Sequence, residues 1–448
     1  MSVHAVEGGS LVRYPDLKSP DTMTKRGWWL VGVNILVPGS AQLLAGSRRL
    51  GRFGVGATFT LWALALIAFA VNYFFPRVIT TVASNVIGLT VVQVLLAAYA
   101  VLWVILTLDT LRLVRLVRAA PNARPFIAGL AVIVLTATAG AAAYGAVITG
   151  SARTALDTLF SDGQYEEPVD GQYNILLMGG DAGADRTGLR PDSLSVVSIN
   201  ADTGATTIVG VPRNFENATF SEGSPLWGPF PNGYDCGDEC LINYLYTYGT
   251  DHPELYPNAE AEGSNPGIEA TRDAVSGVTG LSIQYYVLVD MQGFAQLIDS
   301  LGGVEIDVPE RTAIGGVTGA EPEGYIEAGV QRMDGATALW YGRTRYDSTD
   351  FARMERQRLV QQAMIKQFEP ANVLTKFSAI VDAGVQVVKT DVPQVMIPGF
   401  VDLATKAKGQ PVVPLELVPP LVDSLDPDYD AIHTLVDTTI HPAEAEQG

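Results

Sequence analysis

Residues 173–214, YNILLMGGDAGADRTGLRPDSLSVVSINADTGATTIVGVPRN, contain three short segments that predict β-strands. The segments 173–179, 192–200 and 205–212 are rich in Val and Ile and are bounded by Gly, Asp and Pro. The turn ADTG at 201–204 joins the last two segments and predicts a hairpin.

The chain beyond these strands alternates between helical and extended patterns. From Asp334 onward helical patterns dominate, whereas the segment from Asn214 to Asn265 is irregular and rich in Gly, Pro and Asn. The alternation predicts an α/β layered domain. The further predicted elements are a helix at 268–280, a strand at 284–290, a helix at 294–303 that ends on glycine, and strands at 304–309 and 412–420.

The N-terminal third of the chain differs in charge and hydropathy from the rest. Residues 1–150 carry 12 Lys and Arg against 4 Asp and Glu, whereas the remainder carries 17 against 44. The stretches 53–75, 86–108 and 126–149 hold no charged residue, and each is long enough to cross a hydrocarbon core of about 30 Å as a helix. Residues 28–46 are also apolar but are interrupted by Pro38-Gly39-Ser40, which predicts a re-entrant or interfacial segment or a kinked fourth span.

The basic loops predict the orientation of these spans. Four arginines crowd the short loop before the last span, and positive loops remain cytoplasmic. We therefore expect the large acidic domain outside the cell, where a nucleic-acid partner is not expected. The four arginines are Arg112, Arg115, Arg118 and Arg124. The expected organisation is a cytoplasmic segment 1–27, a membrane region 28–150, a linker 151–170, an extracytoplasmic domain 171–440 and a tail 441–448.

The only two cysteines, Cys236 and Cys240, lie four residues apart in a Gly-rich segment. An extracytoplasmic compartment permits a disulfide between them, with free thiols as the alternative. A zinc site is not expected, because none of the four histidines is within ten residues of this pair.

The stretch 341–358, YGRTRYDSTDFARMERQR, gathers five of the twelve arginines that follow residue 150. Arg343 and Arg345 alternate, so in an extended run they would point the same way. Ser348-Thr349-Asp350 predicts a helix N-cap, after which Arg353, Arg356 and Gln357 share one helix face, while Arg358 lies about 100° further round. Guanidinium groups beside a helix N-terminus match pyrophosphate oxygens, whereas a solvated helix surface is the alternative.

Two further motifs place charged residues at predicted strand ends. GGDAGADRTGLRPD, 179–192, brings Asp181, Asp185 and Asp192 to the ends of two strands, and carboxylates there suit Mg²⁺. A solvated acidic turn is the alternative. In GVPRNF, 210–215, Arg213 follows a strand and a proline and can bind an oxyanion or form a surface salt bridge.

These motifs, in this order, resemble the LytR-CpsA-Psr family of bacterial cell-wall ligases, most closely its actinobacterial members. The matching parts are ILLMGGDAGADRTGLRPDSLSVVSIN, IVGVPRN, CLINYLYTYG, YYVLVDMQGFAQLIDSLGGVEIDVP and LWYGRTRYDSTDFARMERQR, and with their spacing they cover roughly residues 170–440. The resemblance implies a three-layer α/β/α sandwich that encloses an apolar pocket for a polyprenyl chain. It also implies a ligase that moves a secondary glycopolymer (arabinogalactan, teichoic acid or capsule type) from a polyprenyl-pyrophosphate carrier onto peptidoglycan, releasing polyprenyl phosphate.

The resemblance also implies roles for individual residues. Asp181 and Asp192 match the ligands of Mg²⁺, with Mn²⁺ as an alternative ion, and Asp350 matches a further acidic site residue, a candidate general base. Asn214 stands where many members have aspartate, so we expect no role for it. The residues that match pyrophosphate binders are Arg213, Arg343, Arg345, Arg353 and Gln357, to which helix geometry adds Arg356.

Two other functions are compatible with these residues. One is a non-catalytic membrane-anchored receptor for polyprenyl-linked glycans, which would tolerate loss of the aspartates better than loss of the arginines. The other is a pyrophosphatase that uses water as the acceptor. In all three hypotheses the partners are a polyprenyl-linked glycan and the membrane, and the ligase adds peptidoglycan.

Overall fold

The computed structural model describes residues 12–13, 15–83, 85–161, 163, 165–181, 190–237, 240–315, 321–346, 348–368 and 388–442. The chain divides into two compact units, Met1–Arg153 and Thr154–Gly448, called here the N-terminal and C-terminal units. Each unit is considered separately.

The N-terminal unit is helical. Within the described residues three helices are long and apolar enough to cross a membrane, Arg48–Phe74, Val86–Arg118 and Arg124–Leu159, and the three stretches predicted as spans lie in them. Large apolar side chains such as Phe69 and Ile87 are exposed on them, as suits a lipid environment. The helices are α1 (Pro20–Leu36), α2 (Ser40–Ala45), α3 (Arg48–Phe74), α4 (Pro76–Ala83), α5 (Val86–Val114), η1 (Leu116–Arg118) and α6 (Arg124–Leu159).

The apolar stretch 28–46 forms no continuous helix. Helix α1 ends at Leu36, and the short helix α2 begins at Ser40, so the chain breaks at the Pro-Gly pair. Gly39 has a φ of 95°, and a Cβ added there would lie 2.7 Å from the backbone nitrogen of Val55 in α3. The glycine is therefore required both for the left-handed turn and for the close approach of the two segments.

The C-terminal unit is built on a six-stranded sheet. The strand order is β10-β3-β2-β1-β4-β9, with β1–β4 and β10–β3 parallel and the other pairs antiparallel. The turn 201–204 joins β2 and β3, which confirms the predicted hairpin. The strands are β1 (Gln172–Asp181), β2 (Arg190–Asn200), β3 (Thr206–Val211), β4 (Tyr285–Asp290), β9 (Val388–Thr390) and β10 (Val412–Glu416).

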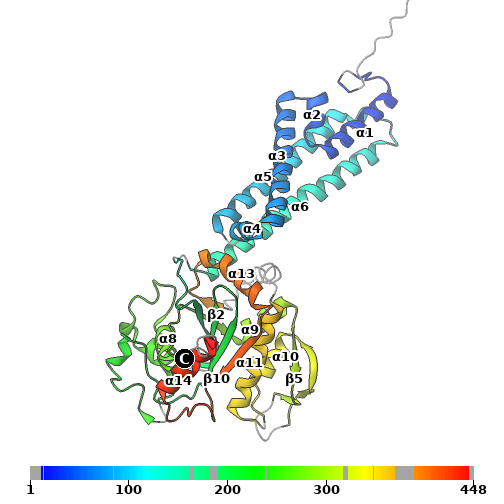
Figure 1. Cartoon of the computed structure of the whole chain (residues 1–448). Coiled ribbons are helices and arrows are strands. Elements are labelled where there is room, and N and C mark those ends of the chain that lie inside the picture. Colours follow the sequence, from blue (N-terminus) through cyan, green and yellow to red (C-terminus); the bar gives the residue numbers. More distant parts are fainter. Residues whose placement is uncertain are drawn as a thin grey trace, which may run out of the picture. The chain divides into compact units, whose positions relative to one another are not determined.

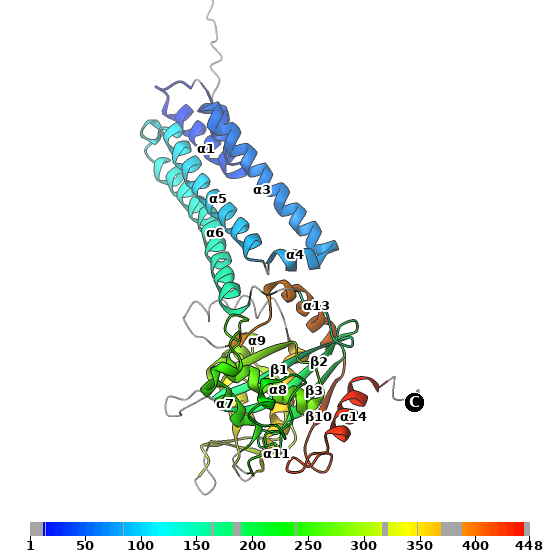
Figure 2. The same cartoon turned by 90° about the vertical axis from the view of Figure 1, so that its left-hand side faces the viewer.

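Helices cover both faces of this sheet, which confirms the predicted α/β/α layers (Figure 1). Alternate strand residues such as Leu176, Val196 and Val209 pack on one face against α7, α8 and α14, where Figure 2 also shows α14 beside β3. The opposite face meets α9, α10 and α11. The helices are α7 (Leu245–Asp251), α8 (Pro266–Thr279), α9 (Met291–Leu301), α10 (Gly335–Arg343), α11 (Asp350–Gln367), α13 (Ile397–Ala407) and α14 (Tyr429–Ile440), with short 3-10 turns at η2 (Pro225–Trp227), η4 (Ile242–Tyr244), η5 (Pro253–Leu255) and η6 (Gln394–Met396).

Local signals explain where the predicted helices begin and end. Asn265 caps α8 by accepting from the backbone N–H of Ile268, and Gly280 ends that helix in the left-handed conformation. Asp290 caps α9 in the same way, and Gly302 ends it. Both helices therefore carry a side-chain cap at the start and a glycine just after the end.

Three features differ from the sequence-based expectation. The strand at 304–309 is β5 (Val304–Val308), but it pairs with β8 (Gly329–Met333) outside the central sheet, and β6 (Thr312–Ile314) pairs with β7 (Gly324–Ile326). The edge strand β9 was not predicted and lies in the part of the chain where helical patterns dominate. Residues 151–159 of the expected linker continue α6, because nothing in that segment breaks a helix before Ser161.

The predicted disulfide is present. Cys236 and Cys240 are bonded within the irregular segment, and their Cα atoms are 5.2 Å apart. The bond closes a small loop in the region between β3 and α8.

Candidate active site

A β-bulge aims Asp192 out of the sheet. Gly179 pairs with Ser193 and Gly180 pairs with Pro191, so Asp192 is the extra residue on β2. Bulges of this kind re-aim a side chain at the end of a strand pair. Asp181 ends β1 opposite Arg190, and the two aspartates therefore come to the same end of the β1–β2 pair. The side chain of Asp181, together with Asp185, lies outside the described residues.

Arg213 follows β3 at the same end of the sheet and forms two ion pairs. One joins it to Asp192, and the other places its Nη2 3.5 Å from Oδ1 of Asp350. The side chain of Arg213 is 24% exposed and that of Asp192 is 37% exposed. This half-buried arrangement is not a solvated surface salt bridge.

Helix α11 begins at the same place, capped as predicted. The hydroxyl of Thr349 accepts from the backbone N–H of Ala352 at 3.2 Å. One turn later Arg353 Nη1 lies 3.0 Å from Oδ1 of Asp350, and its Nη2 donates to the backbone oxygen of Asp192 at 3.0 Å. The helix start, β2 and the end of β3 thus meet around one group of charged side chains, called here the charged cluster: Asp192, Arg213, Arg343, Arg345, Asp350 and Arg353.

Arg353 is the most deeply buried cation of this cluster. It is 4% exposed, and its Nε has no hydrogen-bond partner among the described residues. Burial lowers the pKa of Arg353 from its ordinary value, and the Asp350 carboxylate opposes that shift. A buried guanidinium with an unused donor favours an incoming anion, because an unpaired buried donor is unfavourable.

Arg343 and Arg345 flank the end of a helix, not an extended run. The prediction of a strand-like segment was wrong, because α10 continues to Arg343 and ends at Thr344. Thr344 is buried, whereas both arginines are exposed. Both line the two cavities that adjoin the charged cluster.

An apolar groove lies on one side of the charged cluster. Its volume is about 290 Å³, and it runs between the face of the sheet and helices α9, α10 and α11. Its charged end is lined by Asp192, Arg353, Arg343 and Arg345. Its apolar wall is formed by Leu177, Met178, Val287, Val289, Phe294, Leu297, Leu339, Val360 and Met364.

A polar cavity lies on another side of the same cluster. Its volume is about 590 Å³, and Arg213, Arg343, Arg345 and Asp350 contribute to its wall. The remaining lining residues are Asn214, Gly315, Trp340, Thr344, Tyr346 and Ser348. The two cavities share Arg343 and Arg345, so the guanidinium groups stand between an apolar and a polar compartment.

The other predicted residues of α11 are divided between the site and the scaffold. Gln357 lines the groove and donates to the backbone oxygen of Gly342 at 3.0 Å. Arg356 is 6% exposed and instead turns toward α10, where its Nε donates to the backbone oxygen of Tyr341 at 2.9 Å and its Nη2 to that of Thr344. Its placement favours a role in holding α10 and gives no support to the predicted phosphate contact.

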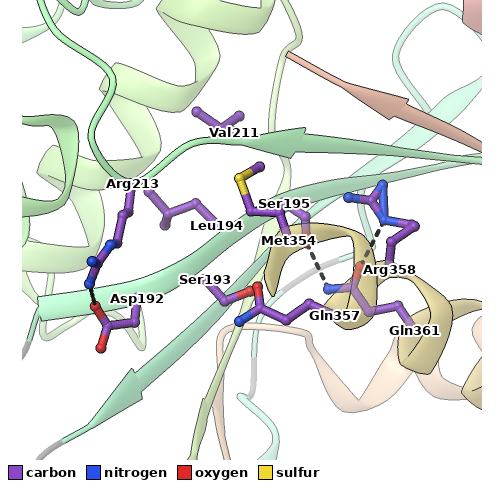
Figure 3. A pocket seen from close by; sticks show the side chains of 10 residues that line it. All are labelled: Asp192, Ser193, Leu194, Ser195, Val211, Arg213, Met354, Gln357, Arg358 and Gln361. Carbon is purple, nitrogen blue, oxygen red and sulfur yellow. Dashed lines mark hydrogen bonds and ion pairs between the residues drawn. The ribbon is translucent and has the colours of Figure 1, made fainter. Parts of the chain in front are cut away.

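Beneath the site, α11 is tied to β2 and β3 around a cavity of about 10 Å³ (Figure 3). Gln361 donates to the hydroxyl of Ser195 at 3.0 Å, and Arg358 donates to the backbone oxygen of Ile208 at 2.8 Å. Arg358 also pairs with Glu416 of β10. Arg358 therefore faces away from the charged cluster, as its helical position predicts, but it is buried.

The residues at the β1–β2 end fit a magnesium ion. Mg²⁺ binds through one or two carboxylates and takes phosphate and water as its other ligands. Asp192, paired with the guanidinium group of Arg213, offers one such carboxylate, and Asp181 ends the adjoining strand β1. Among the described residues there is no group of three or more His, Cys, Asp or Glu side chains that could hold an ion by itself.

Sequence reasoning missed two residues near the cluster. Asn214, to which no role was assigned, lines the polar cavity together with Trp340. A helical interpretation of 335–343 would have placed Trp340 next to Arg343, three residues later on the same face.

Comparisons of this chain with protein families and with curated proteins agree on one family. The model of the LytR_cpsA_psr family matches residues 138–417. The chain is 27% identical over 250 residues to the polyisoprenyl-teichoic acid–peptidoglycan teichoic acid transferase TagU of Halalkalibacterium halodurans, covering 55% of this chain and 69% of that protein. It is 29% identical over 240 residues to the cell wall biosynthesis protein LcpA of Corynebacterium glutamicum, covering 48% of this chain and 44% of that protein. The crystal structure of TagV from B. subtilis covers 61% of this chain and 97% of its own, with 22% identity and a TM-score of 0.43. The chain thus spans between 44% and 69% of the length of these two curated relatives.

Proposed function

The chain belongs to the LytR-CpsA-Psr family, and we propose that it is a glycopolymer–peptidoglycan phosphotransferase. The donor is a secondary glycopolymer of arabinogalactan, teichoic acid or capsule type carried on polyprenyl pyrophosphate. The observation that carries this proposal is the charged cluster between an apolar groove and a polar cavity. In a lipid-linked pyrophosphate an apolar tail is joined directly to two phosphates, which fits the groove and the charged cluster beside it, and the polar cavity leaves room for sugars next to the phosphates.

The proposed reaction is a phosphoryl transfer. A hydroxyl oxygen of a peptidoglycan sugar attacks the phosphorus that carries the glycopolymer, and a new O–P bond forms. The bond between that phosphorus and the bridging oxygen breaks, polyprenyl phosphate leaves, and the hydroxyl proton is lost to a base. Asp350 is the candidate base because it lines the polar cavity beside Arg213.

The arginines stabilise charge that is present throughout the reaction. A pyrophosphate remains anionic in the transition state, so fixed cations at its oxygens lower the barrier. Arg353 is suited to this because it is buried and held by Asp350 and by the backbone of Asp192. Gathering the cations in one place allows an otherwise acidic unit to bind a dianion.

Asp181 and Asp192 would hold Mg²⁺, or Mn²⁺ in its place. The ion would neutralise part of the phosphate charge when bound. The pairing of Asp192 with Arg213 keeps that carboxylate oriented toward the phosphate site. Arg213 thereby contributes both to phosphate binding and to the position of an ion ligand.

Membrane anchorage would keep the enzyme in the same membrane as its lipid-linked donor. We place the C-terminal unit outside the cell, because the arginine-rich loop before α6 favours a cytoplasmic position. Glu260 is exposed, and both native cysteines are in a disulfide, so Glu260→Cys provides a single labelling site. A membrane-impermeant thiol reagent should label it in intact cells, and labelling only after lysis would contradict the orientation.

The reaction itself can be tested with the purified full-length chain. We expect a synthetic polyprenyl-pyrophosphate disaccharide and peptidoglycan to give a phosphodiester-linked product together with polyprenyl phosphate, both detected by mass spectrometry. Free glycan phosphate without a linked product would instead indicate a pyrophosphatase. Binding of the donor without any turnover would indicate a receptor.

A further inference from the structure

The polar cavity is twice the size of the groove and has a different wall. Its volume of about 590 Å³ lies in the range of small-molecule sites, and its wall combines a tryptophan with hydroxyl, amide and charged side chains. Such a mixture suits a sugar, which presents C–H groups on its ring faces and hydroxyls at its edge. The groove, by contrast, has an apolar wall beyond its charged end.

The direction of attack decides which sugar enters this cavity. In phosphoryl transfer the attacking and leaving oxygens lie roughly in line with the phosphorus. The leaving polyprenyl phosphate extends into the apolar groove, so the attacking hydroxyl must arrive from the side away from it. Because the two cavities meet at Arg343 and Arg345, that side is the polar cavity. The donor sugar is a lateral substituent of the phosphorus and does not occupy the in-line direction.

Trp340 gives this cavity a flat apolar surface. It lies on α10 and is 37% exposed, and the Cζ of Arg343 lies 5.6 Å from its ring centre. A large aromatic side chain left partly open beside a cation can stack against a pyranose ring while the cation contacts phosphate. Its neighbour Tyr341 is fully buried. Trp340 is therefore exposed because it lies on a different face of α10 from Tyr341.

Asn214 gives the cavity an unused hydrogen-bonding group. Its Oδ1 is buried and has no hydrogen-bond partner among the described residues. A buried acceptor without a partner is unfavourable. A ligand hydroxyl or amide N–H that donates to Oδ1 would remove this free-energy cost and so favour binding. An amide, unlike a carboxylate, cannot take a proton from the attacking hydroxyl, which makes Asn214 a binding group and leaves Asp350 as the candidate base.

We propose that the polar cavity is the acceptor subsite, in which Trp340 stacks against an N-acetylated hexopyranose of a glycan strand and Asn214 hydrogen-bonds to its polar substituents. This inference rests on the proposed transferase function. It assigns Trp340 and Asn214 to the acceptor and the apolar groove to the donor.

The test compares acceptor and donor parameters in the full-length chain in detergent. The donor is a synthetic polyprenyl-pyrophosphate disaccharide, and the acceptor is a lipid-free β-1,4-linked N-acetylglucosamine–N-acetylmuramic acid oligosaccharide. We expect Trp340→Ala to raise the acceptor KM about tenfold, with donor affinity within about twofold of the wild type, and Trp340→Phe to restore most of the loss. Asn214→Ala should also raise the acceptor KM. Tyr325→Ala removes a similarly exposed aromatic ring on β7 and serves as the matched control.

Each outcome has a distinct meaning. An unchanged acceptor KM in both Trp340→Ala and Asn214→Ala, with wild-type transfer intact, would overturn the acceptor subsite and leave the transferase function standing. A parallel loss of donor affinity would show that the cavity holds the donor sugar and would also overturn the inference. Failure of the wild type to form a phosphodiester would instead refute the proposed function. Thermal melting shows whether each variant is folded. If Trp340→Ala does not fold, the acceptor KM of Trp340→Phe tests the role of Trp340 instead.

Discussion

Replacing Arg358 with methionine should lower the free energy of unfolding of the C-terminal unit by about 3–5 kcal/mol, because the change leaves Glu416 as an unpaired buried charge. The side chains of Arg358 and Glu416 are 7% and 21% exposed. Arg358 also donates to the backbone oxygen of Ile208 at 2.8 Å. The site is tightly packed, since a Cβ added to Gly210 would lie 2.1 Å from Oε2 of Glu416.

A matched double variant separates charge from packing. Replacing a whole buried ion pair with apolar residues of similar volume is often neutral or stabilising, whereas removing one partner is costly. The variant with both Arg358→Met and Glu416→Met should therefore recover most of the stability that the single Arg358→Met variant loses. The single change should lower the Tm by roughly 6–10 °C, at about 2 °C for each kcal/mol in a unit of this size.

The loss should depend on pH with a definite sign. Burial raises the pKa of Glu416, and Arg358 opposes this rise. The folded carboxyl therefore binds a proton more tightly than the unfolded one already in the wild type, and more tightly still without Arg358, so the folded state of the variant gains more stability as the pH falls. The difference in the free energy of unfolding between the wild type and Arg358→Met should accordingly be smaller at about pH 5 than at about pH 8.

Thermal melting of the full-length chain in detergent, at both pH values, measures these differences. A Tm for Arg358→Met that matches the wild type would refute the reasoning, because it would mean that the pair is solvated. A double variant no more stable than the single one would also contradict it, since the loss would then come from packing and not from the unpaired carboxylate.

The remaining predictions concern the charged cluster and the groove. Arg353→Lys should reduce transfer roughly ten- to a hundredfold although charge is kept, because lysine cannot make the contacts with Asp350 and the backbone of Asp192 together. The exposed Arg311 gives the control variant Arg311→Lys, and equal activities of the two variants would argue against phosphate binding by Arg353. Asp192→Ala should abolish Mg²⁺-dependent transfer in a metal titration while polyprenyl monophosphate still binds; loss of both would argue that the residue serves lipid binding instead. Leu297→Trp should fill part of the groove and weaken binding of a long polyprenyl phosphate more than binding of a two-isoprene analogue. An equal effect on both ligands would mean that the polyprenyl tail does not bind in the groove.

Local patterns in the sequence were sufficient for the long apolar helices, for several strands and helices of the C-terminal unit and for the charged motif. The three uncharged stretches correspond to the three long apolar helices, because length and composition alone decide whether a helix can span a bilayer. The hairpin between β2 and β3 and the caps of α8, α9 and α11 followed from residues adjacent in the chain. The short spacing of the two cysteines likewise predicted the disulfide between them.

The placement of individual arginines required the tertiary structure. Periodicity put Arg353 and Arg356 on neighbouring parts of α11, but only the packing of α10 against α11 turned Arg356 into a buried partner of two backbone oxygens. Periodicity also placed Arg358 away from the phosphate site, yet its burial depends on β3 and on Glu416 of β10. A helical wheel gives a direction for each side chain, whereas its environment is set by elements far away in sequence.

The same distinction applies to the two cavities. The arginine-rich motif by itself predicted an anion site, because its guanidinium groups lie close together in the chain. The groove draws its wall from β1, β4, α9, α10 and α11, and the polar cavity joins Asn214 after β3 to Trp340 on α10. No local pattern in the chain specifies such a wall, because it exists only when the sheet and the helices pack. The sequence alone therefore determined the three long apolar helices and the charged motif, and the packing of helices on the sheet decided what lies on either side of that motif.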